Sequence, residues 1–134
     1  MAKRRPEPRW LSRTVVDAIH NDQLREHGGL PGVRDENLLE SALARPQQKW
    51  RYVEPPDLSM LAAAYAFGLV NNHPYRDGNK RIGLLAMITF LGVNGHEFAA
   101  TDAEVVAEFL SLADGRVSED TLADWIRQHS SKRR

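Results

Sequence analysis

The stretch LSMLAAAYAFGLVNNHPYRDGNKRIGLLAMITFLGV, residues 58–93, decides the fold. It consists of two strongly apolar segments, 58–70 and 82–93, joined by a short polar corner. The first segment is rich in small residues that let other helices approach closely, and apolar residues fall on every side of the second. Both segments are therefore predicted to be helices of the core. Each segment is shorter than the roughly 20 residues of a membrane-spanning helix, so no membrane association is expected. The polar corner must lie at the end that the two central helices share.

Four further helices are predicted around this pair, because a capping residue precedes each apolar pattern. The first helix ends at Gly28-Gly29, and the second is expected to stop at Pro46 because proline disrupts a helix interior. Asp57 or Ser59 opens the first central helix, and Pro74 ends it. No alternating strands are long enough to found a sheet. The predicted fold is an all-α bundle of about six helices, and the four caps are Ser12, Asp35, Thr101 (with Glu104 as a capping box) and Ser118.

Length and composition indicate one domain spanning residues 1–134, with residues 1–10 and 130–134 as flexible tails. The chain has no cysteine, which excludes a disulfide scaffold and a thiolate zinc site and fits a reducing, cytoplasmic location. Its formal net charge is zero, so a globally basic surface is absent and no direct nucleic-acid binding is expected. The N-terminus lacks the apolar core of a secretory signal.

The segment PQQKWRYVEPPD, residues 46–57, has prolines at both ends and a short aromatic centre. Proline is confined to the ends and edges of strands, so this composition predicts a loop or a short extended flap. The two aromatic residues of the segment fit the core equally well. The candidate flap residues are Lys49, Trp50, Arg51, Tyr52 and Val53.

The polar corner has the composition of an anion site at the start of the second central helix. The first turn of a helix presents unpaired backbone N–H groups and a partial positive charge. Gly78 leaves room for a ligand close to the backbone, and Asn79, Lys80 and Arg81 add donors and positive charge. Cations oppose the dipole at this end of a helix, so a bound anion is expected to offset them. Phosphate is the natural candidate.

Two more residues of the corner suit phosphoryl chemistry. Asp77 is a lone carboxylate beside the expected phosphates, which is a typical Mg²⁺ ligand. The imidazole of His73 can accept a proton from an attacking hydroxyl, while Tyr75 can anchor the loop in the core. The alternative interpretation of these residues is a solvated corner between two helices. A P-loop does not match, since no Ser or Thr follows the lysine. The remaining histidines are scattered and are expected at the surface or at helix ends: His20, His27, His96 and His129.

The sequence HPYRDGNKR, residues 73–81, resembles the signature HxFx(D/E)GN(G/K)R of the Fic superfamily. GGLPGVRDENLLESALARP, residues 28–46, is similar to the N-terminal mark of its death-on-curing (Doc) branch, and the likeness extends from about residue 12 to residue 128. The resemblance implies the helical Fic fold, with His73 as general base, Asp77 as Mg²⁺ ligand and residues 78–81 on the phosphates of ATP. It also implies that residues 49–53 form a flap that aligns the target chain by strand addition.

The resemblance further indicates which group is transferred. AMP-transferring Fic enzymes carry an arginine three positions after the first, where this chain has Leu84. The Doc branch shares this departure, and its activity is transfer of the γ-phosphate to a threonine of elongation factor Tu, as a serine/threonine-type protein kinase that arrests translation. A Phd-type antitoxin is the implied partner, because this chain lacks the inhibitory pattern (S/T)xxxE(G/N). The alternatives are a transferase of AMP or UMP and an inactive Fic-shaped binding module.

Overall fold

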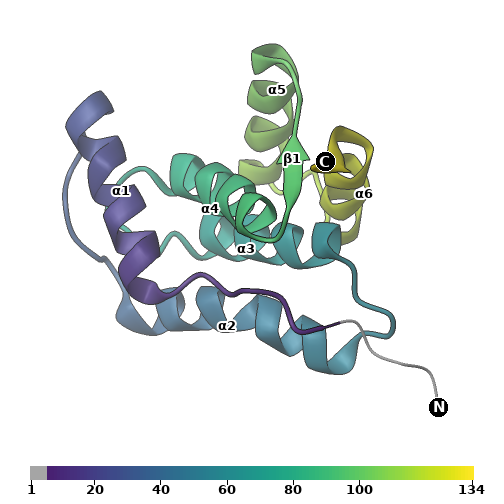
Figure 1. The fold of residues 1–134 in the computed structure, drawn as a ribbon. Helices are drawn as coiled ribbons and strands as arrows, with labels where there is room; N and C mark the ends of the chain where they lie inside the picture. Colours follow the sequence, from purple (N-terminus) through teal and green to yellow (C-terminus); the bar gives the residue numbers. More distant parts are fainter. Residues whose placement is uncertain (1–5) are drawn as a thin grey trace.

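The computed structural model describes residues 6–134, which form six helices and one small sheet (Figure 1). The helices are α1 (Arg13–His27), α2 (Glu36–Tyr52), α3 (Leu58–Asn72), α4 (Asn79–Val93), α5 (Asp102–Ala113) and α6 (Glu119–His129). Strands β1 (His96–Phe98) and β2 (Ser130–Lys132) form an antiparallel pair. The predicted all-α bundle is confirmed. Among the described residues, no helix combines the length and apolar character needed to cross a membrane.

Helix α3 is the centre of the bundle, in contact with α2, α4 and α6 (Figure 1). Small residues let its neighbours approach closely. A Cβ atom on Gly68 would lie 3.2 Å from the Cα of Ala42 in α2. A Cβ on Gly83 of α4 would lie 2.7 Å from Cγ2 of Val70, a distance that real Cβ atoms essentially never show. These two glycines therefore set the spacing on either side of α3.

The helix starts follow the predicted caps. The side chains of Ser12, Asp35, Asp57 and Ser118 accept hydrogen bonds from backbone N–H groups at the starts of α1, α2, α3 and α6. Thr101 forms the predicted capping box with Glu104 at the start of α5. Within residues 6–134, α4 alone begins without a side-chain cap. Capping is local in sequence, which explains why it could be predicted.

Helix α2 does not stop at Pro46, so the prediction of an extended flap over residues 49–53 is wrong. Lys49, Trp50, Arg51 and Tyr52 belong to α2, and only Val53, its C-cap, has an extended backbone. Proline removes one helical hydrogen bond, but Pro46 is buried on the same side of α2 as the core residues of that helix. Packing of this apolar face therefore offsets the missing bond.

The C-terminal residues 130–132 were expected in a flexible tail and instead form β2, which corrects that prediction. Beyond the strand, the N–H of Arg133 donates to the carbonyl of Gly95 at 2.7 Å, and its guanidinium donates to the carbonyl of Gly92. Of the predicted N-terminal tail, residues 1–10, the structure describes residues 6–10. Trp10 stacks on Phe90 with ring centroids 5.9 Å apart, and residues 1–5 lie outside the described part of the chain.

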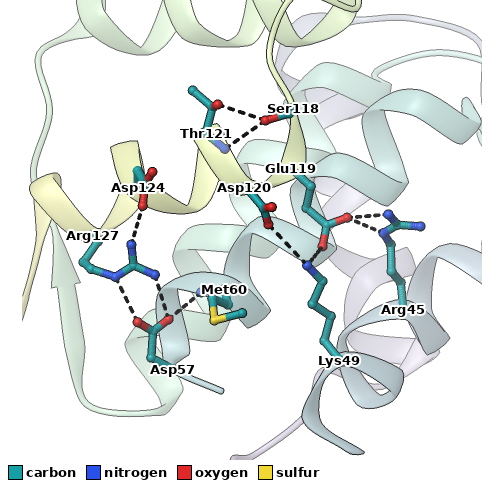
Figure 2. A network of polar contacts seen from close by, with 10 residues as sticks. All are labelled: Arg45, Lys49, Asp57, Met60, Ser118, Glu119, Asp120, Thr121, Asp124 and Arg127. Atoms are coloured by element: carbon teal, nitrogen blue, oxygen red, sulfur yellow. Dashed lines mark hydrogen bonds and ion pairs between the residues drawn. The ribbon is translucent and has the colours of Figure 1, made fainter. Parts of the chain in front are cut away.

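An ion-pair network fastens α6 to α2 (Figure 2). Glu119, the first residue of α6, is buried, and its Oε1 accepts a hydrogen bond from Nε of Arg45 at 2.6 Å. Nζ of Lys49 lies 2.8 Å from Oε2, an ion-pair distance without hydrogen-bond geometry. In the same view, Arg127 of α6 bridges Asp57 and Asp124. Lys49, a predicted flap residue, is thus a structural contact of α6.

Replacing Glu119 by alanine is expected to lower the free energy of unfolding by about 1–3 kcal/mol, because two cations lose a buried partner. Arg45 is 44% exposed and can be solvated, which keeps the loss below that of a fully buried pair. Asp120→Ala is the control, since Asp120 is also acidic in the first turn but is 89% exposed. Urea denaturation should show less than about 0.5 kcal/mol for this control. Equal losses in both variants would assign the effect to what Asp120 shares with Glu119, a negative charge in the first turn and an ion pair with Lys49, rather than to burial.

A second polar contact joins α6 to α5. Nδ1 of His129 donates to the carbonyl of Trp125 at 2.8 Å, and its Nε2 lies 2.9 Å from Oε2 of Glu104. These partners, the carbonyl first, raise the pKa of His129 above its ordinary value. The pKa of Glu104 is lowered to about 2, mainly by the backbone N–H of Thr101 and then by His129. Both charges are therefore present together at mildly acidic pH.

This contact predicts a pH-dependent stability. A raised histidine pKa stabilises the fold fully below the unfolded-state value, and the contribution disappears as the pH rises through the folded-state pKa. The difference in unfolding free energy between the wild type and His129→Gln should therefore be largest near pH 5.5 and shrink toward pH 9. Urea titrations at these two pH values measure it, with His96→Gln as the control. A difference that stays constant with pH would contradict the prediction.

Candidate active site

Two loops far apart in sequence lie side by side at one end of the bundle. Residues 28–35 connect α1 to α2, and residues 73–78 connect α3 to α4. The N–H groups of Arg34 and Asp35 both donate to the carbonyl of Pro74, at 2.7 and 3.1 Å. The N–H of Arg76 donates to the carbonyl of Gly32 at 3.1 Å, and Val33 forms an isolated bridge with Tyr75. The structure thus joins the two motifs on which the family resemblance rests.

His73 occupies the C-cap of α3 in the left-handed region, with φ 49° and ψ 51°. It is the one non-glycine residue in the described chain with a positive φ. Glycine usually occupies such a cap, so the unusual conformation makes His73 a candidate functional residue. The guanidinium of Arg34 donates to the carbonyls of His73 and Asn72 at 2.7 and 2.9 Å. Arg34 therefore holds the backbone of His73 while the residue stays exposed.

Asp77 lies against the start of the other loop. Its Oδ2 accepts a hydrogen bond from the N–H of Leu30 at 2.8 Å. Gly29 makes this approach possible, because its φ is +124° and a Cβ there would lie 3.3 Å from the Cβ of Asp77. The GGLPG motif therefore shapes the surroundings of this carboxylate.

A divalent cation is compatible with Asp77 but would need ligands from outside the chain. No group of three or more His, Cys, Asp or Glu side chains arranged to hold a metal occurs within residues 6–134. Mg²⁺ is commonly bound by one or two carboxylates together with substrate phosphates and water. A single exposed aspartate next to a candidate phosphate site fits that pattern.

Asn79 has a different role from the one predicted for its side chain. Its Oδ1 accepts from the N–H of Tyr75 at 3.0 Å, and its Nδ2 donates to the carbonyl of Tyr75 at 2.9 Å. The carboxamide therefore bonds both backbone groups of Tyr75 and holds the loop against the first turn of α4. What Asn79 offers to an anion is its backbone N–H in the first turn of α4.

The start of α4 is open and basic. Gly78 is the N-cap with φ 78° and no side-chain cap, so the N–H groups of Asn79, Lys80 and Arg81 have no helical partner. Lys80 and Arg81 are exposed and form no ion pair with any described residue. Backbone donors and uncompensated cations at a helix start together favour an anion.

Leu84 lies one turn beyond these cations and faces α5. It lines an apolar groove of about 180 Å³, with Lys80 and Arg81 at one end. The side of the groove formed by α5 consists of Val105, Val106, Phe109 and Leu110. The side chain at position 84 therefore faces the apolar residues of α5, and Leu84 itself offers no hydrogen bond to a phosphate.

The predicted flap residues do not belong to this site. Lys49 lies 13 residues after Glu36 along α2, which at about 1.5 Å per residue is about 20 Å from the start of the helix. The two loops of the site adjoin that start. Trp50 packs edge-on against Trp10 instead, with centroids 6.4 Å apart. The end of α2 therefore lies away from the two loops of the candidate site.

Two residues of α1 that support the loop were not predicted as part of the site. His20 was expected at the surface or a helix end, but it is 2% exposed and contacts Tyr75 and Asp77. Asp17 accepts a hydrogen bond from the Tyr75 hydroxyl at 2.6 Å. Burial, followed by this contact, raises the pKa of Tyr75, so the phenol remains a donor. One signal was available: His20 follows the buried Val16 by four residues, on the same face of a helix.

Fold and site together define a class of protein: a small helical domain in which a loop histidine and a carboxylate precede an open, basic helix start. The chain belongs to the Fic/DOC family, whose model matches residues 10–91. It is 31% identical over 121 residues to the Protein kinase doc of Escherichia phage P1, covering 90% of this chain and 94% of that protein. It is 46% identical over 74 residues to Toxin Doc of Mycolicibacterium smegmatis, covering 54% of this chain and 57% of that protein. The family resemblance inferred from the two motifs is confirmed.

Proposed function

We propose that this protein is a toxin with protein kinase activity, which transfers the γ-phosphoryl group of ATP to a hydroxyl side chain of a translation factor. The observation that carries the proposal is the open, basic start of α4, which directly follows the loop holding His73 and Asp77. The names of the relatives from phage P1 and Mycolicibacterium smegmatis support kinase and toxin roles. Elongation factor Tu is the first target to test.

In the proposed mechanism, the phosphates of ATP bind at the start of α4. The free N–H groups of the first turn and the side chains of Lys80 and Arg81 neutralise their charge. Asp77 would hold Mg²⁺, which supplies further neutralisation of the phosphates when bound. The target hydroxyl oxygen attacks the γ-phosphorus, and the bond from that phosphorus to the bridging oxygen of ADP breaks. His73 accepts the hydroxyl proton as general base.

The transferred group is the decisive question, because an AMP transferase would use the same base and metal ligand. Leu84 favours phosphoryl transfer, since its apolar surroundings on α5 provide no contact for a terminal phosphate. Incubating the protein with elongation factor Tu and ATP labelled at either the α or the γ position distinguishes the two. We expect γ-label on a threonine or serine, located by mass spectrometry. Incorporation of α-label would refute phosphoryl transfer and support AMP transfer.

An antitoxin is proposed as the regulatory partner, of the Phd type. The basis is the relation to proteins named Doc, together with the absence of an inhibitory (S/T)xxxE(G/N) pattern from the sequence. Co-expression with the product of a short neighbouring reading frame should relieve growth arrest. Arrest that persists despite formation of a stable complex would argue against this form of control.

A further inference from the structure

His20 is the one buried histidine of the five in this chain, all of which lie in the described part. It belongs to α1, whereas the candidate catalytic loop connects α3 to α4. The known family signature around residues 73–81 does not include it. A buried imidazole that touches the loop from another helix therefore needs its own explanation.

Three contacts define the position of His20. Its Nε2 lies 2.7 Å from the carbonyl oxygen of Asp77, and because a carbonyl oxygen only accepts, Nε2 carries the hydrogen. Its ring stacks on Tyr75 with centroids 3.8 Å apart and planes at 15°. A Cβ on Gly78 would lie 3.5 Å from Nε2. The imidazole thus packs against the turn formed by Asp77 and Gly78, which leads into α4.

The bond to Asp77 fixes the orientation of one peptide group. In a planar trans peptide, the C=O of Asp77 and the N–H of Gly78 point in opposite directions. Holding the oxygen toward α1 therefore turns the N–H of Gly78 away from α1. That N–H has no hydrogen-bond partner among the described residues. It becomes a fourth donor, beside the three free N–H groups at the start of α4.

Asp17 adds a second attachment of the loop to α1, one helical turn before His20. It accepts from the Tyr75 hydroxyl at 2.6 Å and from Nε of Arg13 at 2.9 Å. Arg13 in turn donates to Glu36 at the start of α2. Tyr75 is therefore held at its ring by His20 and at its hydroxyl by Asp17, while the peptide after Asp77 is held by His20 alone.

We infer that His20 is a positioning residue, which orients the Asp77–Gly78 peptide so that the Gly78 N–H binds phosphate. The inference rests on the proposed function, because the ligand is the phosphate chain of ATP. Purely apolar packing does not account for the geometry, since a core side chain needs no donor. The donor of His20 faces a carbonyl next to the metal-ligand candidate, where a rotated peptide would remove one phosphate contact.

Two substitutions separate the donor from the ring. His20→Phe keeps a stacking ring and removes the donor, whereas His20→Gln keeps an N–H donor at a similar reach and removes the ring. Calorimetry should show that His20→Phe binds ATP and pyrophosphate at least about 10-fold more weakly than the wild type does. This loss corresponds to one hydrogen bond to a charged group. His20→Gln should restore binding to within about threefold of the wild type. Tyr75→Phe, which leaves the Asp77 bond in place, is the matched control.

A second readout does not depend on ATP. In the unliganded protein, the Gly78 amide should shift and broaden in ¹⁵N NMR spectra of His20→Phe and return toward its wild-type position in His20→Gln. Equal behaviour of the two variants would overturn the positioning role and leave His20 as a packing residue. If the wild type bound neither ATP nor pyrophosphate, the proposed function would fail and with it the phosphate role of Gly78. The NMR comparison would still decide whether His20 orients the peptide.

Discussion

Replacing His73 by alanine is expected to reduce phosphoryl transfer by about 10²–10⁴-fold, the usual contribution of a positioned general base. The fold should be unaffected, because His73 is exposed and Arg34 binds its backbone carbonyl rather than its side chain. Expression of the variant should therefore no longer arrest growth. The rate is measured by γ-label incorporation into the target, and the fold by urea denaturation.

Two matched variants make this result specific. His73→Asn keeps a residue that tolerates the left-handed conformation but cannot accept the proton, so it should be as inactive as His73→Ala. His96→Ala removes a histidine beyond the far end of α4, about 22 Å away along its 15 residues, and should retain full activity. Growth arrest that persists with His73→Ala would contradict the kinase proposal and favour a Fic-shaped binding module.

Helix starts and the polar corner could be predicted because the information is local. Ser12, Asp35 and Ser118 each bond to a backbone N–H three residues away, so sequence spacing alone indicates the cap. The absence of such a residue before α4 was equally visible at Gly78. The corner between residues 71 and 81 is likewise a single continuous segment, and its chemistry follows from its composition.

The predictions that the structure corrects concern contacts between residues distant in sequence. Pro46 predicts a helix end from local rules, but packing of α2 on α3 continues the helix for six more residues. Residues 130–132 carry no strand signal of their own and become β2 by pairing with β1, some 34 residues earlier. His20 contacts a loop 57 residues away. No periodicity in a single sequence identifies such partners.

The glycines of α4 give the second prediction with a large expected effect. Gly83→Ala should lower the free energy of unfolding by about 1–3 kcal/mol, because the new Cβ would lie 2.7 Å from Cγ2 of the buried Val70. Gly92→Ala adds the same methyl group to the same helix, where nothing lies within 4 Å. It should stabilise the protein by about 0.5–1 kcal/mol through helix propensity. Urea denaturation of both variants measures the two changes.

The two variants are expected to change stability in opposite directions, which separates the effect of packing from that of helix propensity. A gain in stability for Gly83→Ala would contradict the prediction, because it would mean that α3 and α4 can move apart without loss. The site depends on this spacing, since the loop carrying His73 and Asp77 joins these two helices. Gly83→Ala should therefore also weaken phosphoryl transfer while Gly92→Ala leaves it unchanged. Full activity in a strongly destabilised Gly83→Ala would show that the loop is held by α1 and residues 28–35 rather than by the helix pair.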